Sequence, residues 1–296
     1  MIPIRYVEPV FRPPSEAESL ILPVTDGCSW NQCTFCEMYT APQKKFRARD
    51  EAEVIESIRL TGQRYGDQVR RVFLADGDAT VLPTRRLLTI LAAIREHMPA
   101  VRRISSYCLP RNLRKKSQQE IDELAAAGLS MVYVGAESGD DRVLAAVNKG
   151  ESFESTREAL DKLGAAGITR SVMILNGLGG KVYTHQHAEN SARLANATQP
   201  EYLATLVVSF PQGEQRLRAG FPEWEPLDQH ELFVEMEQFL SALELRRTVF
   251  RSDHASNWLV LKGTLGADKE RLLAQVRQAI ATPAAAHLRP AWARGL

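Results

Sequence analysis

The segment IDELAAAGL, residues 121–129, recurs in altered form as LDKLGAAGI, residues 160–168. In both copies a helical pattern ends in Ala-Ala-Gly and a short apolar run follows at once, over residues 129–135 and 168–175. Gly128 and Gly167 suit the left-handed conformation that closes many helices. The repeated joint predicts that one helix-to-strand unit is used twice, which is typical of a β/α protein.

Four further segments have the length and composition of strands, being apolar or β-branched and mostly bounded by turn residues. They are residues 20–25, 71–75, 103–107 and 202–209. Residues 87–94 carry apolar side chains at the spacing of one helix face, and Asp50 with Glu53 and Ser117 with Glu120 resemble capping boxes. Strands that alternate with helices predict parallel pairing. Six such units favour an incomplete barrel over an open sheet, although periodicity alone leaves both open.

The chain divides into three parts on this pattern. An N-terminal arm covers residues 1–19, an α/β core shaped as a partial (β/α)6 TIM-like barrel covers 20–210, and an α+β extension covers 211–296. The extension begins with a loop, PQGEQRLRAGFPEWEP, and continues with a helix near 228–245, a short extended segment and a helix near 267–281. We expect the extension to cover the substrate cavity.

Composition sets bounds without indicating a function. Apolar residues make up 44% and charged residues 25%, which is ordinary for a globular protein. Lys and Arg number 37 against 36 for Asp and Glu, so there is no overall basic footprint for nucleic acid, and a local patch remains open. The N-terminus does not have the pattern of a signal peptide, and no stretch has the ~18 apolar residues of a membrane span. These features predict a cytoplasmic protein.

Three of the four cysteines lie within nine residues, in GCSWNQCTFCEMYT, residues 27–40. Cys28, Cys33 and Cys36 directly follow the first strand, and functional groups gather at this end of parallel strands. Clustered thiolates in a reduced compartment bind zinc or an iron–sulfur cluster. A structural zinc site usually has four protein ligands. No histidine lies near the three cysteines, because the first histidine along the chain is His97. A cubane held by three cysteines instead leaves one iron open to a small molecule.

The spacing Cys28-x4-Cys33-x2-Cys36, with Phe35 before the third cysteine, resembles the cluster loop of the radical S-adenosylmethionine enzymes. Their usual spacing has three residues between the first two cysteines, and this chain has four. The resemblance implies a [4Fe–4S] cluster that reductively cleaves S-adenosylmethionine to a 5′-deoxyadenosyl radical, which abstracts hydrogen from a substrate. It also implies an electron donor of the reduced flavodoxin or ferredoxin type.

Other segments match this family in order at the strand ends. By resemblance Asp76, Gly77 and Asp78 form the turn whose backbone holds the methionine amine. Glu137, in the VGAESG segment, resembles the Gly-x-Glu-Ser-Gly segment of the Elongator-like and MiaB-like branch and would bind the ribose or the amino group. Asn176 and Gly177, in LNGLGG, resemble the glycine-rich segment beside the adenine, which Phe35 would also approach.

Outside the shared core, FRSDHASNWLVLKG at 250–263 gathers Arg251, His254 and Asn257. Similar segments occur in radical enzymes with this same cysteine spacing. We expect the three side chains to bind a substrate, for which Arg251 suits an anion; the plainer interpretation is a polar turn between two strands.

Several other residues have plainer interpretations. Cys108 follows the third strand and reads as a small core residue, not as a ligand. His185 and His187 read as surface or capping residues. The basic run from Lys44 to Arg49 reads as a solvated loop or as a docking site for an acidic electron donor or an anion.

Two alternative functions stay open on the sequence. One is a module that binds zinc or an iron–sulfur cluster without catalysis. The other is a radical enzyme that modifies RNA, which would need a local basic face. With only Cys108 outside the trio, there is no cysteine set for an auxiliary cluster.

Overall fold

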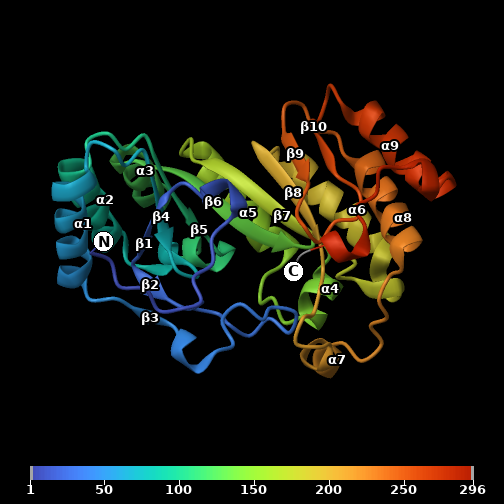
Figure 1. The fold of residues 1–296 in the computed structure, drawn as a ribbon, viewed down its shortest axis with the longest axis horizontal. Coiled ribbons are helices and arrows are strands. Elements are labelled where there is room, and N and C mark those ends of the chain that lie inside the picture. The colour runs from blue at the N-terminus through green and yellow to red at the C-terminus, as the bar shows by residue number, and fades with distance from the viewer. Residues whose placement is uncertain (1–2, 295–296) are drawn as a thin grey trace. The chain divides into compact units, whose positions relative to one another are not determined.

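The computed structural model describes residues 3–294, and these fall into two compact units (Figure 1). Unit 1 comprises Met1–Asn31, Cys36–Val134 and Asp161–Arg170. Unit 2 comprises Gln32–Phe35, Gly135–Leu160 and Ser171–Leu296. The first two residues of the expected N-terminal arm and the last two of the expected extension lie outside the described residues.

Unit 1 contains parallel strands covered by helices. Its strands are β1 (Leu20–Pro23), β2 (Thr25–Asp26), β3 (Arg47–Ala48), β4 (Arg71–Ala75), β5 (Arg103–Tyr107) and most of β6 (Leu129–Glu137). Its helices are α1 (Glu51–Tyr65), α2 (Thr84–His97) and α3 (Gln118–Ala127), with short 3-10 turns η1 (Pro14–Glu16), η2 (Pro42–Lys44), η3 (Ala79–Val81) and η4 (Pro110–Leu113). β1, β4, β5 and β6 pair in this order, each parallel to the next.

One face of these strands buries an apolar cluster that includes Ile21, Phe73, Met131 and Tyr133. The helices pack against the strands through their apolar faces. Helix α2 also packs against both α1 and α3. Figure 1 shows α1 and α2 side by side on the outer side of β1 and β4. The strands therefore all deliver their carboxyl ends to one edge of the unit, which positions the loops that follow β1, β4 and β5.

Unit 2 continues the β/α pattern and adds the C-terminal elements. Its strands are β7 (Thr169–Asn176), β8 (Tyr202–Val207), β9 (Val249–Ser252) and β10 (Leu261–Thr264). Its helices are α4 (Asp141–Ala146), most of α5 (Phe153–Ala165), α6 (Gly180–Thr198), α7 (Gln215–Gly220), α8 (Gln229–Ala242) and α9 (Lys269–Ala281), followed by η5 (Pro283–Ala285) and η6 (Ala291–Ala293). β7, β8 and β9 are parallel, and β10 returns antiparallel beside β9.

The predicted strands all form, within two residues of their expected ends, and the α/β fold class with parallel strands is confirmed. Gly128 (φ 114°) and Gly167 (φ 72°) both take the left-handed conformation after their helices. Ser117 and Glu120 form a complete capping box, whereas Asp50 caps α1 by accepting from the Glu53 backbone N–H at 3.1 Å.

Two expectations for the C-terminal part were incomplete. The segment expected to be a loop after residue 210 contains the short helix α7, whose Leu217 is fully buried. The expected extended segment forms a strand, β9, that joins β8 in parallel. The helix α7 and the strand β9 each pack against segments that are distant in the sequence. A local sequence pattern does not reveal such contacts.

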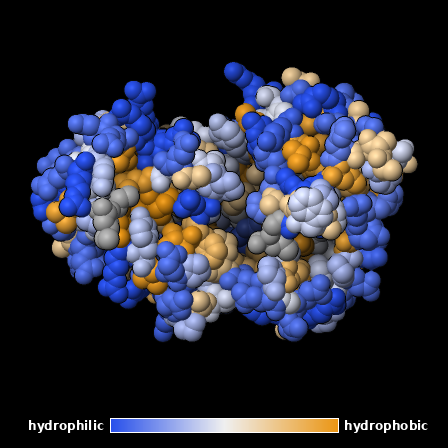
Figure 2. All heavy atoms as spheres, viewed as in Figure 1, coloured by the Kyte–Doolittle hydropathy of each residue, from blue (hydrophilic) through white to orange (hydrophobic). Residues whose placement is uncertain are grey.

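Within residues 3–294 we find no helix with the length and apolar character needed to cross a membrane. Figure 2 shows hydrophilic side chains over much of the face in view, with apolar ones mixed among them.

Candidate functional site

The cysteine loop runs from the end of β2 to η2. Cys28, Cys33 and Cys36 are partly buried thiols, and Cys108 is a buried thiol that is 1% exposed. Beside the first cysteine, the Trp30 ring lies 3.7 Å from the guanidinium of Arg111. The three loop thiols therefore stand apart in exposure from Cys108, whose backbone N–H donates to Tyr133 O in the interior of unit 1.

Unit 2 holds the middle of the loop, residues 32–35, through its backbone. The N–H of Thr34 donates to Val147 O at 3.0 Å, and the Arg216 guanidinium donates to Cys33 O at 3.2 Å. The Phe35 ring packs against an apolar cluster that includes Phe221 and Trp224. The expected place of Phe35 beside a cofactor stays a prediction, and its packing against this cluster fixes the ring.

Lys149 connects Phe35 with Glu137. Its Nζ lies 5.8 Å from the centroid of the Phe35 ring and donates to Glu137 Oε1 at 3.0 Å. Glu137 ends β6 with φ 64°, a left-handed conformation that costs a non-glycine residue roughly 1–2 kcal/mol. Its carboxylate folds back over Gly135, where a Cβ would lie 2.1 Å from Glu137 Oε1. A side chain at position 135 would therefore displace this carboxylate from its present position.

Asp78, after β4, accepts hydrogen bonds from the start of the cysteine loop. Its carboxylate takes the Ser29 N–H at 2.8 Å and the Ser29 hydroxyl at 2.5 Å, and it also accepts from Asn112 Nδ2 at 3.2 Å. Burial raises the pKa of Asp78 above its ordinary value, although the hydrogen bonds from Ser29 oppose this. The carboxylate is therefore committed to protein partners.

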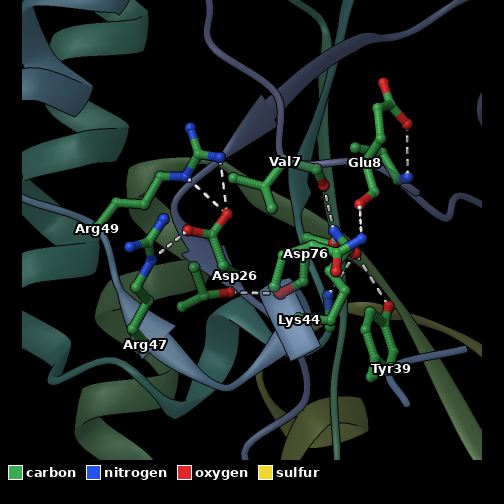
Figure 3. A network of polar contacts seen from close by, with 12 residues as sticks. Val7, Glu8, Asp26, Tyr39, Lys44, Arg47, Arg49 and Asp76 are labelled. Carbon is green, nitrogen blue, oxygen red and sulfur yellow. Dashed lines mark hydrogen bonds and ion pairs between the residues drawn. The ribbon is translucent and has the colours of Figure 1, made fainter. Parts of the chain in front are cut away.

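The carboxylate of Asp76 also binds protein partners, and these lie at the end of the cysteine loop (Figure 3). Its carboxylate forms a buried ion pair with Lys44 and accepts from the Tyr39 hydroxyl at 3.0 Å and from the Gly77 N–H at 2.9 Å. Its carbonyl accepts from the Thr25 hydroxyl. Burial, and then the charge of Asp76, raise the pKa of Tyr39 well above its usual range, so that this phenol stays a donor.

The interpretation of the basic run as a solvated loop holds only in part, because Lys45 and Arg47 are exposed and Lys44 is not. Lys44 is fully buried, because Asp76 and the Val7 carbonyl (2.5 Å) receive its ammonium. Arg47 and Arg49 both bind the buried carboxylate of Asp26, at 2.7 Å each (Figure 3). Asp26 has a lowered pKa because these two hydrogen bonds outweigh its burial, which acts in the opposite direction.

Asn176 and Gly177 end β7 in a turn that is fixed by a glutamate on α8. Glu235, only 1% exposed, accepts from the Gly177 N–H at 2.7 Å, the Thr184 hydroxyl at 2.7 Å and Asn176 Nδ2 at 3.4 Å. Asn176 Oδ1 is buried without a hydrogen-bond partner among residues 3–294. A buried acceptor in this state is unfavourable unless a ligand or water donates to it.

A cavity of about 190 Å³ lies at the ends of β7 and β8 in unit 2. Its wall is mostly apolar and includes Gly177, Val208, Phe210, Trp224 and Leu232. Phe210 and Trp224 meet edge to face, with ring centroids 5.4 Å apart. The cavity is smaller than the roughly 300–1,000 Å³ of pockets that enclose whole ligands, so it suits one ring-sized portion of a larger molecule.

Arg251, His254 and Asn257 lie in and after β9 in three different environments. Arg251 is exposed, opposite Lys262 of β10. Asn257 is buried; its amide accepts from Val207 N–H at 2.9 Å and donates to Thr205 O at 2.8 Å, so it joins the loop to the end of β8. His254 Nδ1 accepts from the Ser256 N–H at 3.1 Å.

His254 is held as a neutral imidazole by this bond. Because Nδ1 accepts a hydrogen bond, the ring proton lies on Nε2. Burial, and then the charge of Arg289, lower the pKa of His254 below its ordinary value. The imidazole is thus a neutral donor through Nε2.

The C-terminal tail holds this loop from the outside. The Arg289 guanidinium donates to the carbonyls of His254 at 2.6 Å and Asn257 at 2.8 Å, and Arg294 donates to Ser256 O at 2.9 Å. The guanidinium of Arg294 also lies 3.9 Å from the Trp258 ring centroid. The tail, expected to be irregular, therefore has a definite structural role.

The expectation that His185 and His187 are both surface or capping residues is half wrong. His185 is exposed and lies 3.4 Å from Glu189. His187 is buried between β6 and β7, with Nδ1 2.8 Å from the Ser138 hydroxyl and Nε2 3.0 Å from Leu175 O. The periodicity of α6 is weak enough that its inward face could not be assigned from sequence.

The sequence did not indicate the structural roles of Lys44, Lys149 and Glu235. The burial of Glu235 could have been inferred from the sequence, because this residue lies on the apolar face of α8 with Leu232, Met236 and Phe239. The burial of the two lysines could not have been inferred, because charged residues in loops are most often solvated.

The donor chemistry of the loop fits an iron–sulfur cluster. The three soft thiols lie within a stretch of nine residues and are partly accessible. Among residues 3–294 no three His, Cys, Asp or Glu side chains converge as a site for a single ion. Three cysteines of a cubane bind three different irons, so a cluster does not require such convergence. The three cysteines therefore have the donor chemistry of proteins that carry an iron–sulfur cluster.

The model of the radical SAM superfamily matches residues 22–195, more than half of the chain, and the chain belongs to this superfamily. Its members are enzymes that use a [4Fe–4S] cluster and S-adenosylmethionine, and their fold is a partial TIM-type barrel. The resemblance noted at the cysteine loop is thereby confirmed, and an enzyme is favoured over a non-catalytic binding module.

Several solved structures share the fold. The methyltransferase TsrM from Kitasatospora setae, with cobalamin and a [4Fe–4S] cluster, is 19% identical with a TM-score of 0.52, over 63% of this chain and 34% of its own. Coproporphyrinogen III oxidase (HemN) from Escherichia coli is 17% identical with a TM-score of 0.55, over 75% and 52%. Methylornithine synthase (PylB) is 14% identical with a TM-score of 0.54, over 92% and 74%. The chain thus spans about a third of TsrM. No curated protein matches it.

Proposed function

We propose that this chain is a single-cluster radical enzyme that forms a 5′-deoxyadenosyl radical and abstracts hydrogen from a substrate that its own C-terminal part helps to bind. The observation that carries the proposal is the set of three partly buried thiols, Cys28, Cys33 and Cys36, in a chain of this superfamily. Cys108, the fourth cysteine, is buried, and a single further thiol does not make a ligand set for a second cluster. When bound, the cluster and S-adenosylmethionine would supply the electron and the radical.

By the family resemblance, the 76–78 turn would bind the methionine end of the cofactor. The carbonyl of Gly77 receives no hydrogen bond from the described residues, which makes it the open acceptor of the turn for the methionine ammonium. Asp76 and Asp78 would contribute by holding this backbone, since their carboxylates are already bonded. Glu137, with Lys149 beside it, would accept from the ribose hydroxyls or the amine.

The 190 Å³ cavity would take the adenine ring. Phe210 and Trp224 offer it an aromatic wall, and Gly177 brings the β7 turn to its edge. The buried Asn176 Oδ1, next to Gly177, is an acceptor without a protein donor and could receive the exocyclic amine.

The substrate would bind at the loop that follows β9. His254 offers a neutral donor through Nε2, and Arg251 offers an exposed cation that suits an anionic group. The amide of Asn257 is committed to β8, so its contribution would be to hold His254 in place. A protein donor of the reduced flavodoxin or ferredoxin type would deliver the electron.

Anaerobic reconstitution tests this function. The wild type should bind about four irons and release 5′-deoxyadenosine when it is reduced with S-adenosylmethionine present. Replacing Cys28, Cys33 or Cys36 by Ala should each abolish both. Stoichiometric zinc without iron in the anaerobic wild type would overturn the proposal.

A further inference from the structure

The two carboxylates of the 76–78 turn point at opposite ends of the cysteine loop. Asp78 binds the beginning of the loop through Ser29, and Asp76 binds its end through Tyr39 and Lys44. All of these residues belong to unit 1, as do Cys28 and Cys36. Figure 3 shows the contacts of Tyr39 and Lys44 with Asp76.

The contact with Ser29 lies next to the first cysteine. Asp78 is completely buried, and both its oxygens are used: Oδ1 accepts the Ser29 backbone N–H and Oδ2 the Ser29 hydroxyl. Asn112 supports the same carboxylate from η4 and also donates to Thr80 at 2.9 Å. The carboxylate therefore fixes both the backbone and the side chain of the residue that follows Cys28.

The contact with Lys44 closes the other end. Lys44 and Asp76 are 0% and 1% exposed, and each has further partners that compensate for its burial. A buried charge that keeps its partner is tolerated, whereas one that loses it is strongly unfavourable. The segment from Tyr39 to Lys44 consequently has one stable position on the turn.

Between the carboxylates, the backbone of Gly77 touches the backbone of the loop directly. A Cβ at Gly77 (φ 78°) would lie 1.9 Å from Gly27 O and 3.0 Å from Cys28 N. No other residue type could bring the turn this close to the first cysteine.

We infer that the 76–78 turn holds the cysteine loop in its cluster-binding geometry, with Asp78 and Asp76 as positioning residues for the segments beside Cys28 and Cys36. The side chains of the turn would thus order the loop, while the carbonyl of Gly77 would serve the cofactor as proposed above. This inference rests on the proposed function for the identity of the cluster, but the ordering of the loop is a property of the protein alone.

The test uses Ser29→Ala, Asp78→Ala and the double variant of the full chain. In the protein without iron, hydrogen exchange of residues 27–31 should become roughly tenfold to a hundredfold faster in each single variant, because a bond to a charged group is lost. The double variant should be no faster than Asp78→Ala, since both changes remove the same contact. After reconstitution, the same variants should lose iron to a chelator faster and change the electron paramagnetic resonance spectrum of the reduced cluster.

The matched control is Glu16→Gln. Glu16 is also a fully buried carboxylate of unit 1, bound by Arg103 at 2.8 Å and Tyr133 at 2.6 Å, with no partner in the cysteine loop. It should lower the melting temperature without changing exchange at residues 27–31 or the spectrum. Lys44→Met tests the other end, where exchange of residues 39–46 should rise.

Wild-type exchange at residues 27–31 in Ser29→Ala and Asp78→Ala would overturn the inference, as would additive effects in the double variant. Failure of the wild type to take up iron would count against the proposed function alone, and the exchange data would still decide the role of the turn.

Discussion

Replacing Glu235 by Leu should destabilise unit 2 strongly, although no charge on the surface changes. The side chain is 1% exposed, and two donors lie 2.7 Å from its carboxylate, the Gly177 N–H and the Thr184 hydroxyl. A hydrogen bond to a charged group contributes about 1.5–3 kcal/mol, and both donors would be left buried without an acceptor. The two bonds together predict a loss of about 3–6 kcal/mol in the free energy of unfolding.

Glu235→Gln separates the charge from the geometry. Its amide oxygen can still accept from Gly177, but the bonds become neutral and contribute about 0.5–1.5 kcal/mol each. We therefore expect a loss of roughly half that of the Leu variant. Both measurements use urea unfolding of the protein without cofactor, followed by tryptophan fluorescence. Trp224 is a suitable reporter because its Nε1 donates to Gly177 O at 3.3 Å.

Glu237→Leu is the control on the same helix. Glu237 pairs with Arg277 at 2.7 Å, but both side chains are substantially exposed, and such pairs contribute about 0–1 kcal/mol. A Glu235→Leu variant that unfolds within about 1 kcal/mol of the wild type would refute the reasoning, because stranded buried donors cost more than this. Equal losses for Glu235 and Glu237 would refute it too.

Three further predictions concern single side chains. Cys108→Ser should leave iron content and 5′-deoxyadenosine release unchanged, as measured after reconstitution, because this thiol is buried and follows a different strand from the cysteine loop; loss of the cluster absorbance would contradict this. Because the pKa of His254 is lowered in the folded chain, the unfolded chain takes up this proton first as the pH falls below 6.5. The free energy of unfolding should therefore decrease more steeply below pH 6.5 in the wild type than in His254→Gln, until His254 is protonated in the folded chain too; equal slopes in pH-dependent urea titrations would argue against a neutral imidazole. Arg289→Ala removes bonds to the carbonyls of His254 and Asn257 and should speed hydrogen exchange at residues 253–258 about tenfold, with α8 unchanged.

The sequence by itself determined the order and type of the elements in the core. Gly128 and Gly167 marked the two helix ends because only glycine takes a left-handed conformation without cost, and this requirement is local. The run at 71–75 could be recognised as a strand because burial on both faces favours apolar residues, and positions 72–75 are all apolar. The cysteine spacing, likewise local, was enough to indicate the superfamily that the family model confirmed.

Only the tertiary structure decided which charged residues are buried and what they hold. Lys44 lies in a basic run that resembles a solvated loop, yet its ammonium is buried against Asp76, 32 positions along the chain. Glu235 fixes the turn at Gly177 across 58 positions. The free energy of a charge depends on its desolvation and on its partner, and the partner is supplied by whichever segment the fold brings alongside. Local periodicity contains no information on that pairing, so the residues that hold the loop and the β7 turn became visible only in three dimensions.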